Sequence, residues 1–508
     1  MFSNCRLHLT SITLFLLSIT AVNAEPWIDT SNIFLKAKIQ LLADQGYIKT
    51  PVTTYPLMWA DIAKDINNIE FALLNDRNKD AVSYIKHQLK LAQKSLTKLE
   101  ANLSLKNKRF TSFGESFRTK NNISLQRTFI SDSFAMKIAT QYSNSPIEGE
   151  SHTRFDGSYA AASIGNWVLS AGMQDRWWGQ GWDSNLSLTN NARPIPALAI
   201  SRKSAIPVGI PFTDIEIPWT VTSFMGVMDD ERVIKDTLLW GFRLNFKPLD
   251  NLEVGITRLA QWGGENRPQN ASTFWNVFIG KDNCGNDGLE CGVNKENEPG
   301  NQQAGYDLRY SVNLFDVPVS IYGQYFAEDG GSKGNSTSIL TEPKVQIGVD
   351  SHFSVFQKPT TLFVEYTETF ADCKDKNNVK DGNCYYEHHI YKTGMRYHQR
   401  TLGSLYDNDA TTLVVGAISS INADTNLTLK FRHLKLNTDN LDKAPGNPII
   451  GNPLTEIAED LIMLSSKVQH SYKNWRFTVG SSYSRSTYQN DIKDRNDVNL
   501  YLNAEVNL

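Results

Sequence analysis

The last residues of the chain, 498–508, alternate strictly between apolar and polar side chains. A period of two predicts a β-strand with one apolar and one polar face. The apolar face holds Val498, Leu500, Leu502, Ala504, Val506 and Leu508, and the other holds Asn499, Tyr501, Asn503, Glu505 and Asn507. An outer-membrane barrel needs such a strand. The edge strand of a soluble sandwich has the same pattern, so this segment alone does not separate the two classes.

The same alternation recurs in earlier segments, with strongly polar residues in the middle of the strands. The apolar sets are Trp240, Phe242, Leu244 and Phe246; Tyr306, Leu308, Tyr310, Val312 and Leu314; Trp475, Phe477, Val479 and Tyr483; and Phe134, Met136, Ile138 and Tyr142. Arg243 and Arg309 lie on the polar sides. Mid-strand arginines do not suit a dry core, but they suit a water-filled lumen. The repetition therefore favours a membrane barrel.

Short turns alternate with long polar loops from about residue 110 to the end. The longest loops cover residues 176–194, 263–303, 328–343, 371–384 and 437–459. Counting gives eighteen or nineteen candidate strands. A barrel whose two ends lie on the same side needs an even number. We therefore predict an all-β transmembrane barrel of about 18 antiparallel strands, and we place the excess strand between Tyr385 and Ala410.

Helical spacing replaces the strand pattern near the start of the chain. Residues 32–45 predict one helix that ends at Gly46, and Pro56 opens a second that runs to Asn67. An apolar stripe from Val82 to Leu99 predicts a third, flanked by lysines. We predict a small periplasmic α-helical domain over residues 25–108 and a barrel over residues 109–508. The lysine face is interpreted as solvated, with contact to anionic lipid or a periplasmic partner as the alternative.

The first 24 residues predict a signal peptide. Arg6 precedes an apolar run over residues 9–20, and Val22-Asn23-Ala24 resembles a cleavage site. The run is short for a membrane anchor, which is the alternative. We expect a protein of the bacterial outer membrane, with the helical domain in the periplasm and the long loops at the cell surface.

Charge and cysteine content narrow the partners. Without Arg6 the chain has 50 basic and 54 acidic residues, which argues against nucleic acid as a partner. Four cysteines remain after the signal peptide: Cys284 and Cys291 in one long loop, and Cys373 and Cys384 in another. An oxidising exterior favours disulfides. Of the three connectivities we expect the two local pairs.

Three tryptophans fall within six residues in the run DRWWGQGW, residues 175–182. Aromatic faces bind the C–H faces of sugar rings, while Asn, Asp and Arg bind their hydroxyls and carboxylates. The candidate polysaccharide-binding residues are Asp175, Arg176, Trp177, Trp178, Trp182, Asn190, Asn191 and Arg193. The alternative is that this segment plugs the lumen, because adjacent residues of an extended chain point in opposite directions.

Other candidates for chemistry are weaker. Trp262, Trp275 and Arg267 border a long loop, and packing is the simpler interpretation than a second sugar platform. His388, His389, His398 and His433 predict hydrogen-bonded lumen side chains, and the acidic run Asp229-Asp230-Glu231 predicts a loop. No G-x-S-x-G motif occurs. We therefore expect no catalytic residues, no metal site and no cofactor.

Several segments resemble the Wzi family of outer-membrane capsule assembly proteins. The most specific is RWWGQGWDSNLSLTNNARPIPALAISR, residues 176–202, preceded by SIGNWVLSAGMQD, residues 163–175. YPLMWADI at 55–62 and YEHHIYKTGMRYHQRTLGSLYDNDA at 386–410 are similar as well. The resemblance implies an eighteen-stranded barrel with a periplasmic helical bundle and a lectin-like, non-enzymatic role. It implies no particular binding residues in the loops.

We therefore expect a monomeric surface lectin that attaches exported capsular or related polysaccharide to the cell and supports capsule assembly. Outer-membrane lipid and the polysaccharide export machinery are the further expected partners. The principal alternative is a solute channel or porin, and an outer-membrane hydrolase is a third hypothesis. An obstructed lumen separates the first of these from the second.

Overall fold

The computed structural model describes residues 25–115, 117–147, 149–213, 215–280, 300–328, 341–370, 373–374, 380–381, 385–388, 390–442, 452–489 and 493–508. The side chains of residues 341–343, 373–374 and 380–381 are not included. The predicted signal peptide, residues 1–24, lies outside this range.

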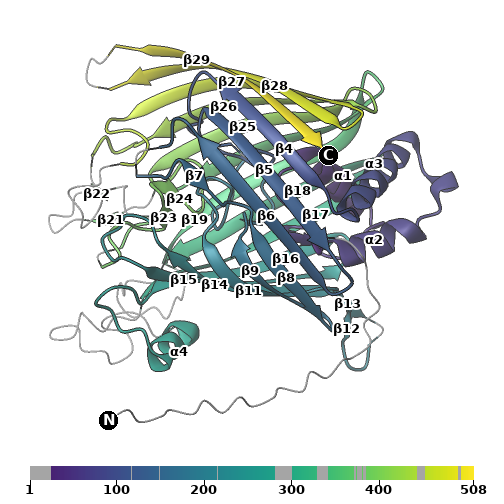
Figure 1. Cartoon of the computed structure of the whole chain (residues 1–508), viewed down its shortest axis with the longest axis horizontal. Helices are drawn as coiled ribbons and strands as arrows, with labels where there is room; N and C mark the ends of the chain where they lie inside the picture. The colour runs from purple at the N-terminus through teal and green to yellow at the C-terminus, as the bar shows by residue number, and fades with distance from the viewer. Residues whose placement is uncertain are drawn as a thin grey trace, which may run out of the picture.

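The described chain is dominated by one closed antiparallel β-barrel (Figure 1). Each strand pairs with its neighbour in sequence, and the last strand pairs with the first to close the barrel, Leu502 opposite Leu103. The segments are β4 (Thr97–Ser104), β5 (Asn121–Ile130), β6 (Phe134–Ser143), β7 (Thr153–Arg154), β8 (Tyr159–Ile164), β9 (Trp167–Met173), β11 (Pro196–Arg202), β14 (Trp219–Met228), β15 (Thr237–Leu249), β16 (Leu252–Trp262), β17 (Gly300–Leu314), β18 (Val317–Glu328), β19 (Thr341–Val355), β20 (Lys358–Glu368), β25 (Ala410–Ser420), β26 (Thr425–Leu436), β27 (Glu459–Tyr472), β28 (Trp475–Tyr488) and β29 (Arg495–Asn507).

The barrel has eighteen strands within the described residues, because β7 and β8 both pair with β6 and form one broken strand. The predicted fold class and strand number are confirmed. The excess candidate strand was expected between Tyr385 and Ala410: β20 pairs directly with β25, and the described residues between these two strands add none to the barrel. The barrel begins at β4, before the predicted domain boundary at residue 109.

The strands place apolar side chains outside and charged ones inside. In β17, Tyr306, Leu308 and Tyr310 are more than 40% exposed, whereas Asp307 and Arg309 are 2% exposed. A soluble protein has the opposite distribution. The alternation therefore fits a barrel with hydrocarbon around it and a polar lumen.

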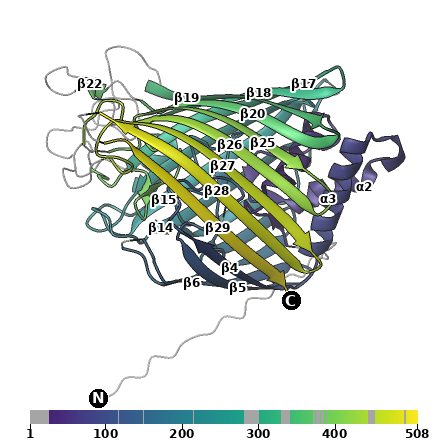
Figure 2. The ribbon, with the colours of Figure 1, turned by 90° about the horizontal axis from the view of Figure 1, so that it is seen from above.

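The helices before residue 93 gather at the end of the barrel where the tight turns and the C-terminus lie (Figures 1 and 2). We call this the turn end, and the opposite one the loop end. The helices are α1 (Ile33–Asp44), α2 (Trp59–Asn68), the 3-10 helix η1 (Phe71–Leu73) and α3 (Asp76–Ala92). The third helix is shorter than predicted, since Leu96 follows its end and Leu99 lies on β4. None of the helices in the described chain has the length and apolar character that crossing a membrane requires.

Helix α1 lies in the lumen, enclosed by the strands of the barrel. Every residue of α1 is buried, and the helix contacts β18 and β25. The side chain of Asn32 caps its first turn by accepting from the Phe34 and Leu35 amides. Its polar residues are buried because barrel residues pair with them: Asp44 accepts from Arg309 and Ser311. The helical segment is therefore part of the lumen filling.

The remaining elements are a helix near the loop end and short strand pairs, one of which, β2 with β10, lies in the lumen. Helix α4 (Ala271–Ile279) packs near the loop end against Trp240 and Trp262, two residues on the outer face of the wall. The short pairs are β1 (Trp27–Ile28) with β3 (Leu57–Met58), β2 (Thr54–Tyr55) with β10 (Trp177–Trp178), β12 (Val208–Gly209) with β13 (Glu216–Ile217), β21 (Cys373–Lys374) with β22 (Lys380–Asp381), and β23 (Arg396–Tyr397) with β24 (Arg400–Thr401).

Candidate functional site: the lumen and its plug

The tryptophan run lies inside the lumen. Trp177, Trp178 and Trp182 are each at most 1% exposed. Residues 177–178 form β10, which pairs with β2 of the N-terminal segment, Trp177 opposite Tyr55 and Trp178 opposite Thr54. One partner enters from the loop end and the other from the turn end, so the two meet within the barrel. We call the lumen segments 50–56 and 174–195 together the plug.

Each indole is fixed by a specific contact. Trp177 Nε1 donates to the Gly181 carbonyl at 3.1 Å, and Trp182 Nε1 donates to Asp350 Oδ2 at 2.6 Å. Trp182 also stacks on Phe363, with ring centroids 6.0 Å apart. Trp178 meets Phe224 edge to face. No face of these three indoles is available to a sugar, so the predicted sugar platform is replaced here by the alternative, a plug of the lumen.

The two glycines of the run permit this close packing. A Cβ on Gly179, where φ is +135°, would lie 1.7 Å from Gln324 Nε2. One on Gly181 would lie 1.8 Å from the Ser184 carbonyl oxygen. Both contacts are far below van der Waals separation, so Gly179 lets the backbone approach β18 of the wall, and Gly181 lets the plug turn tightly on itself.

Asp183 is the charged centre of the plug. Its carboxylate accepts from Lys430 Nζ at 2.7 Å and Arg432 Nη2 at 2.6 Å, and from the Tyr406 hydroxyl. Burial alone would raise the pKa of Asp183, but Arg432 and Lys430 outweigh it and hold that pKa well below its usual range. The plug is therefore joined to strand β26 by charge-assisted hydrogen bonds.

The other predicted site residues also have partners in the protein. Arg118 donates to the Asp175 carboxylate at 2.9 Å and to the Asn190 carbonyl at 2.7 Å. It thereby holds the two parts of the predicted set together. The Arg176 guanidinium lies 4.1 Å from the centre of the Phe224 ring. Asn191 is buried with Asn190, and Arg193 forms a two-bond ion pair with Asp156, at 2.9 and 2.8 Å. Sequence reasoning missed Arg118 because an isolated arginine in a loop gives no local signal.

The remaining candidates have structural roles where the structure describes them. The His388 ring accepts from the Ile390 and Tyr391 amides, while His433 faces Asp460 at 3.0 Å. Asp230 pairs with Arg232, Trp262 packs against helix α4, and Trp275 is part of that helix. His389, Cys284, Cys291, Cys384 and the side chain of Cys373 lie outside the described residues, so the disulfide pairs stay predictions.

One buried group has a metal-like composition. Asp44, Asp350 and His352 place their ligand atoms within 4.8 Å of one another. However, Arg309 donates to both carboxylates, to Asp44 at 2.9 Å and to Asp350 at 2.8 Å. This guanidinium already supplies the positive charge that a cation would bring, so the group is interpreted as an ion-pair cluster that fixes α1 to β17 and β19.

The plug leaves space along one wall of the lumen. A cavity of about 360 Å³ lies between residues 106–115 and strands β26–β29, and we call it the loop-end cavity. A second cavity of about 150 Å³ extends from there toward the turn end. Lys108, Glu115, Lys467 and Tyr501 line both. The lumen is thus filled by the plug on one side and holds two cavities on the other.

Comparison with known proteins identifies the group to which this barrel belongs. The family described as capsule assembly protein Wzi matches residues 92–499, which is most of the chain. This protein belongs to the Wzi capsule assembly family. The family resemblance predicted from the tryptophan run is therefore confirmed.

Two individual proteins are similar to this Wzi family member. An uncharacterized 55.8 kDa protein in the cps region of Klebsiella pneumoniae is 26% identical over 346 residues, which cover 66% of this chain and 64% of that protein. The match thus spans less than two thirds of that relative's length. The structure of Wzi from Escherichia coli overlays with a TM-score of 0.78 at 21% identity, covering 94% of this chain and 98% of that one. That protein is described as a carbohydrate-binding β-barrel of the outer membrane involved in group 1 capsule assembly.

Proposed function

We propose that this protein is a non-enzymatic lectin of the bacterial outer membrane that attaches exported capsular or related polysaccharide to the cell surface and thereby supports capsule assembly. The observation that carries the proposal is the filled lumen in a member of a capsule assembly family. A barrel whose centre is occupied by paired segments from both ends is built to present a surface. It is poorly built to conduct solutes.

The asymmetry of the barrel supports an orientation. Tight turns such as Phe315-Asp316 lie at the end that carries α2 and α3, and most long connections lie at the other; the connection 203–218, with β12 and β13, is the exception. Outer-membrane barrels have short periplasmic turns and long external loops. We place the turn end in the periplasm, where α2 and α3 can meet the export machinery, and the loop end with α4 at the cell surface. The exposed apolar faces of the strands are proposed to contact outer-membrane lipid.

A gene deletion tests the attachment role. Cells that lack the protein should make the same total amount of surface polysaccharide, but the cell-bound fraction should fall and the fraction in the culture medium should rise. Re-expression of the wild-type protein should restore the cell-bound fraction. Unchanged retention after deletion contradicts the proposal, and a loss of total polysaccharide assigns the protein to synthesis or export instead.

A further inference from the structure

The loop-end cavity has an excess of positive charge. Seven basic and three acidic side chains line it among the described residues. The cations outnumber their partners in a consistent way: Lys430 and Arg432 share the single carboxylate of Asp183, while Lys106 and Arg495 share that of Asp497. Each of these two groups therefore has two cations for one carboxylate, and so a net charge of one positive unit.

Lys467 adds a further uncompensated charge. Its ammonium donates to the Gly114 carbonyl at 3.2 Å, and within the described chain no carboxylate lies within 4.0 Å of it. Glu115 responds to this surrounding charge. Its burial would raise the pKa, but Lys108, Lys430, Lys467 and Arg432 outweigh burial and lower the pKa of Glu115 to about 2. The cavity thus has a positive potential that favours an anion.

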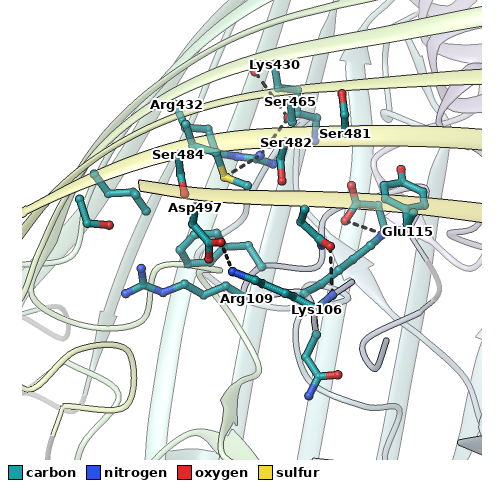
Figure 3. Close-up of a pocket in the computed structure, with 18 of the residues that line it drawn as sticks. Lys106, Arg109, Glu115, Lys430, Arg432, Ser465, Ser481, Ser482, Ser484 and Asp497 are labelled. Atoms are coloured by element: carbon teal, nitrogen blue, oxygen red, sulfur yellow. Dashed lines mark hydrogen bonds and ion pairs between the residues drawn. The ribbon is translucent and has the colours of Figure 1, made fainter. Parts of the chain in front are cut away.

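Hydroxyl groups line the same stretch of barrel wall as Lys430, Arg432 and Lys467. Ser482, Ser484 and Ser486 follow at every second residue of β28, and Ser465 and Ser466 lie beside them on β27. Figure 3 shows several of these serines across the cavity from Lys106 and Arg109. Small side chains leave the space open, and each hydroxyl both donates and accepts hydrogen bonds. A sugar requires the same combination.

The cavity runs from an accessible mouth to a buried floor. The side chains of Lys106 and Arg495 are 45% and 64% exposed, whereas those of Lys430 and Arg432 are 6% and 5% exposed. The mouth lies at the loop end of the barrel. A ligand that enters from this side meets the exposed cations first and the buried ones last.

We infer that the loop-end cavity is a binding site for an acidic saccharide, namely a carboxylate-bearing sugar residue of the polysaccharide that the protein holds. This inference rests on the proposed function and names the ligand class and its site. The carboxylate is bound by Lys467 and the cations near it, and the hydroxyls are bound by the serines of β27 and β28. Phe110 and Met463 add apolar contact for the ring faces.

The test compares two forms of one polymer. The probes are the surface polysaccharide purified from the producing bacterium and the same material after carbodiimide-mediated reduction of its carboxyl groups to alcohols. Binding to the purified full-length protein in detergent is measured at low and high salt. The native polymer should bind more tightly than the reduced one. Added salt should weaken the binding of the native polymer and leave that of the reduced polymer unchanged.

Substitution of Lys467 tests the location of the site. K467Q should weaken binding of the native polymer about tenfold and leave binding of the reduced polymer unchanged, because only the charge is removed. K467R keeps the charge and should bind like wild type. Lys473→Gln is the matched control, since Lys473 lies on the same β27–β28 hairpin but at its turn end. Heat-modifiable migration on gels verifies that each variant forms the barrel.

The outcomes separate this inference from the proposed function. If neither polymer binds wild type, the lectin function itself is contradicted. If both bind equally, or if K467Q binds the native polymer as wild type does, the function stands but the acidic-saccharide site is wrong. Binding confined to the strain's lipopolysaccharide, measured alongside, also overturns it, because the ligand is then lipid-linked and is not the exported polymer.

Discussion

Asp183, in the plug segment 174–195, fixes that segment to the barrel wall. Its carboxylate joins the plug to β26 through Lys430 and Arg432, and all three side chains are almost fully buried. Removing one member of a buried charge group leaves the others without compensation. Asp183 therefore stabilises the plug mainly by balancing the charges of Lys430 and Arg432.

Asp183→Asn should lower the free energy of unfolding by about 3 kcal/mol, because two buried cations lose their shared carboxylate. Thermal unfolding in detergent, followed by the loss of heat-modifiable migration, measures the change. Asp250→Asn is the control: Asp250 pairs with Lys49 in an exposed salt bridge, and its loss should cost no more than about 0.5 kcal/mol. Equal effects of the two substitutions would refute the role given to Asp183.

The same group has a defined pH dependence. Because the folded state lowers the pKa of Asp183, its stabilising contribution is present above the ordinary aspartate pKa and is lost as pH falls through the lowered one. The difference between wild type and D183N should therefore stay constant from pH 7 to about pH 5. It should shrink only well below pH 4. A difference that disappears near pH 6 would assign the effect to another group.

The residues of the candidate site were only partly predictable from the sequence. Composition identified the run 175–182 as unusual, and the resemblance identified the family. The direction of the indoles was not predictable, because it depends on partners such as Phe363 and Lys430 that are distant in sequence. Lys467, the centre of the cavity, looks like any polar residue of an alternating strand. Only closure of the barrel brings it to residues 106–115.

The elements were more predictable than the contacts between them. Period-two alternation identified the strands because the lipid-facing side chains must be apolar along every one. Helix α1 was predicted from its spacing and from Gly46, whose φ is +75°. Its burial inside the lumen was not predictable, since its lysines suit a solvated helix equally well. Tertiary pairing, such as that of Asp44 with Arg309, determined its place.

Gly114 connects two of these elements. It lies in residues 105–120, between β4 and β5, with φ at +79°, and its amide donates to the Thr30 carbonyl just before α1. A Cβ there would lie 2.9 Å from the Ile33 Cβ. Gly114→Ala should therefore cost about 1 kcal/mol for the left-handed backbone and about 1–3 kcal/mol more for displacing α1. Thermal unfolding measures the total.

Gly149 provides a control that separates the two terms. Its φ is also +79°, but nothing lies within 4 Å of an added Cβ. Gly149→Ala should thus show only the backbone cost of about 1 kcal/mol. If G114A and G149A are equally destabilised, the added Cβ at position 114 does not displace α1, and the predicted packing cost is wrong.

At the scale of the whole molecule, the lumen is crossed by segments that enter from both ends of the barrel. Segments from the turn end and the loop end form a two-stranded sheet in the lumen, and Gly179 donates to the Thr53 carbonyl at 3.0 Å. Thr53 in turn donates to Glu253 on β16. The plug is therefore linked to the wall, to the helical segment and to the loops at once, so no single loop works as a separate lid.

Planar-bilayer recordings test this closure and the channel alternative. An open barrel of eighteen strands leaves an aqueous channel, whereas the plugged one should conduct far less. Replacing residues 176–192 by a short Gly-Ser linker should raise the conductance toward that of an open porin. The space that these residues occupied would then fill with water, because the lumen side of the wall is charged. Shortening helix α4 should not raise the conductance, since α4 packs on the outer face of the wall.

Porin-like conductance of wild type would contradict the closed lumen and favour a solute channel. Low conductance in both wild type and the linker variant would show that residues 50–56, residues 105–120 and α1 close the barrel without the tryptophan run.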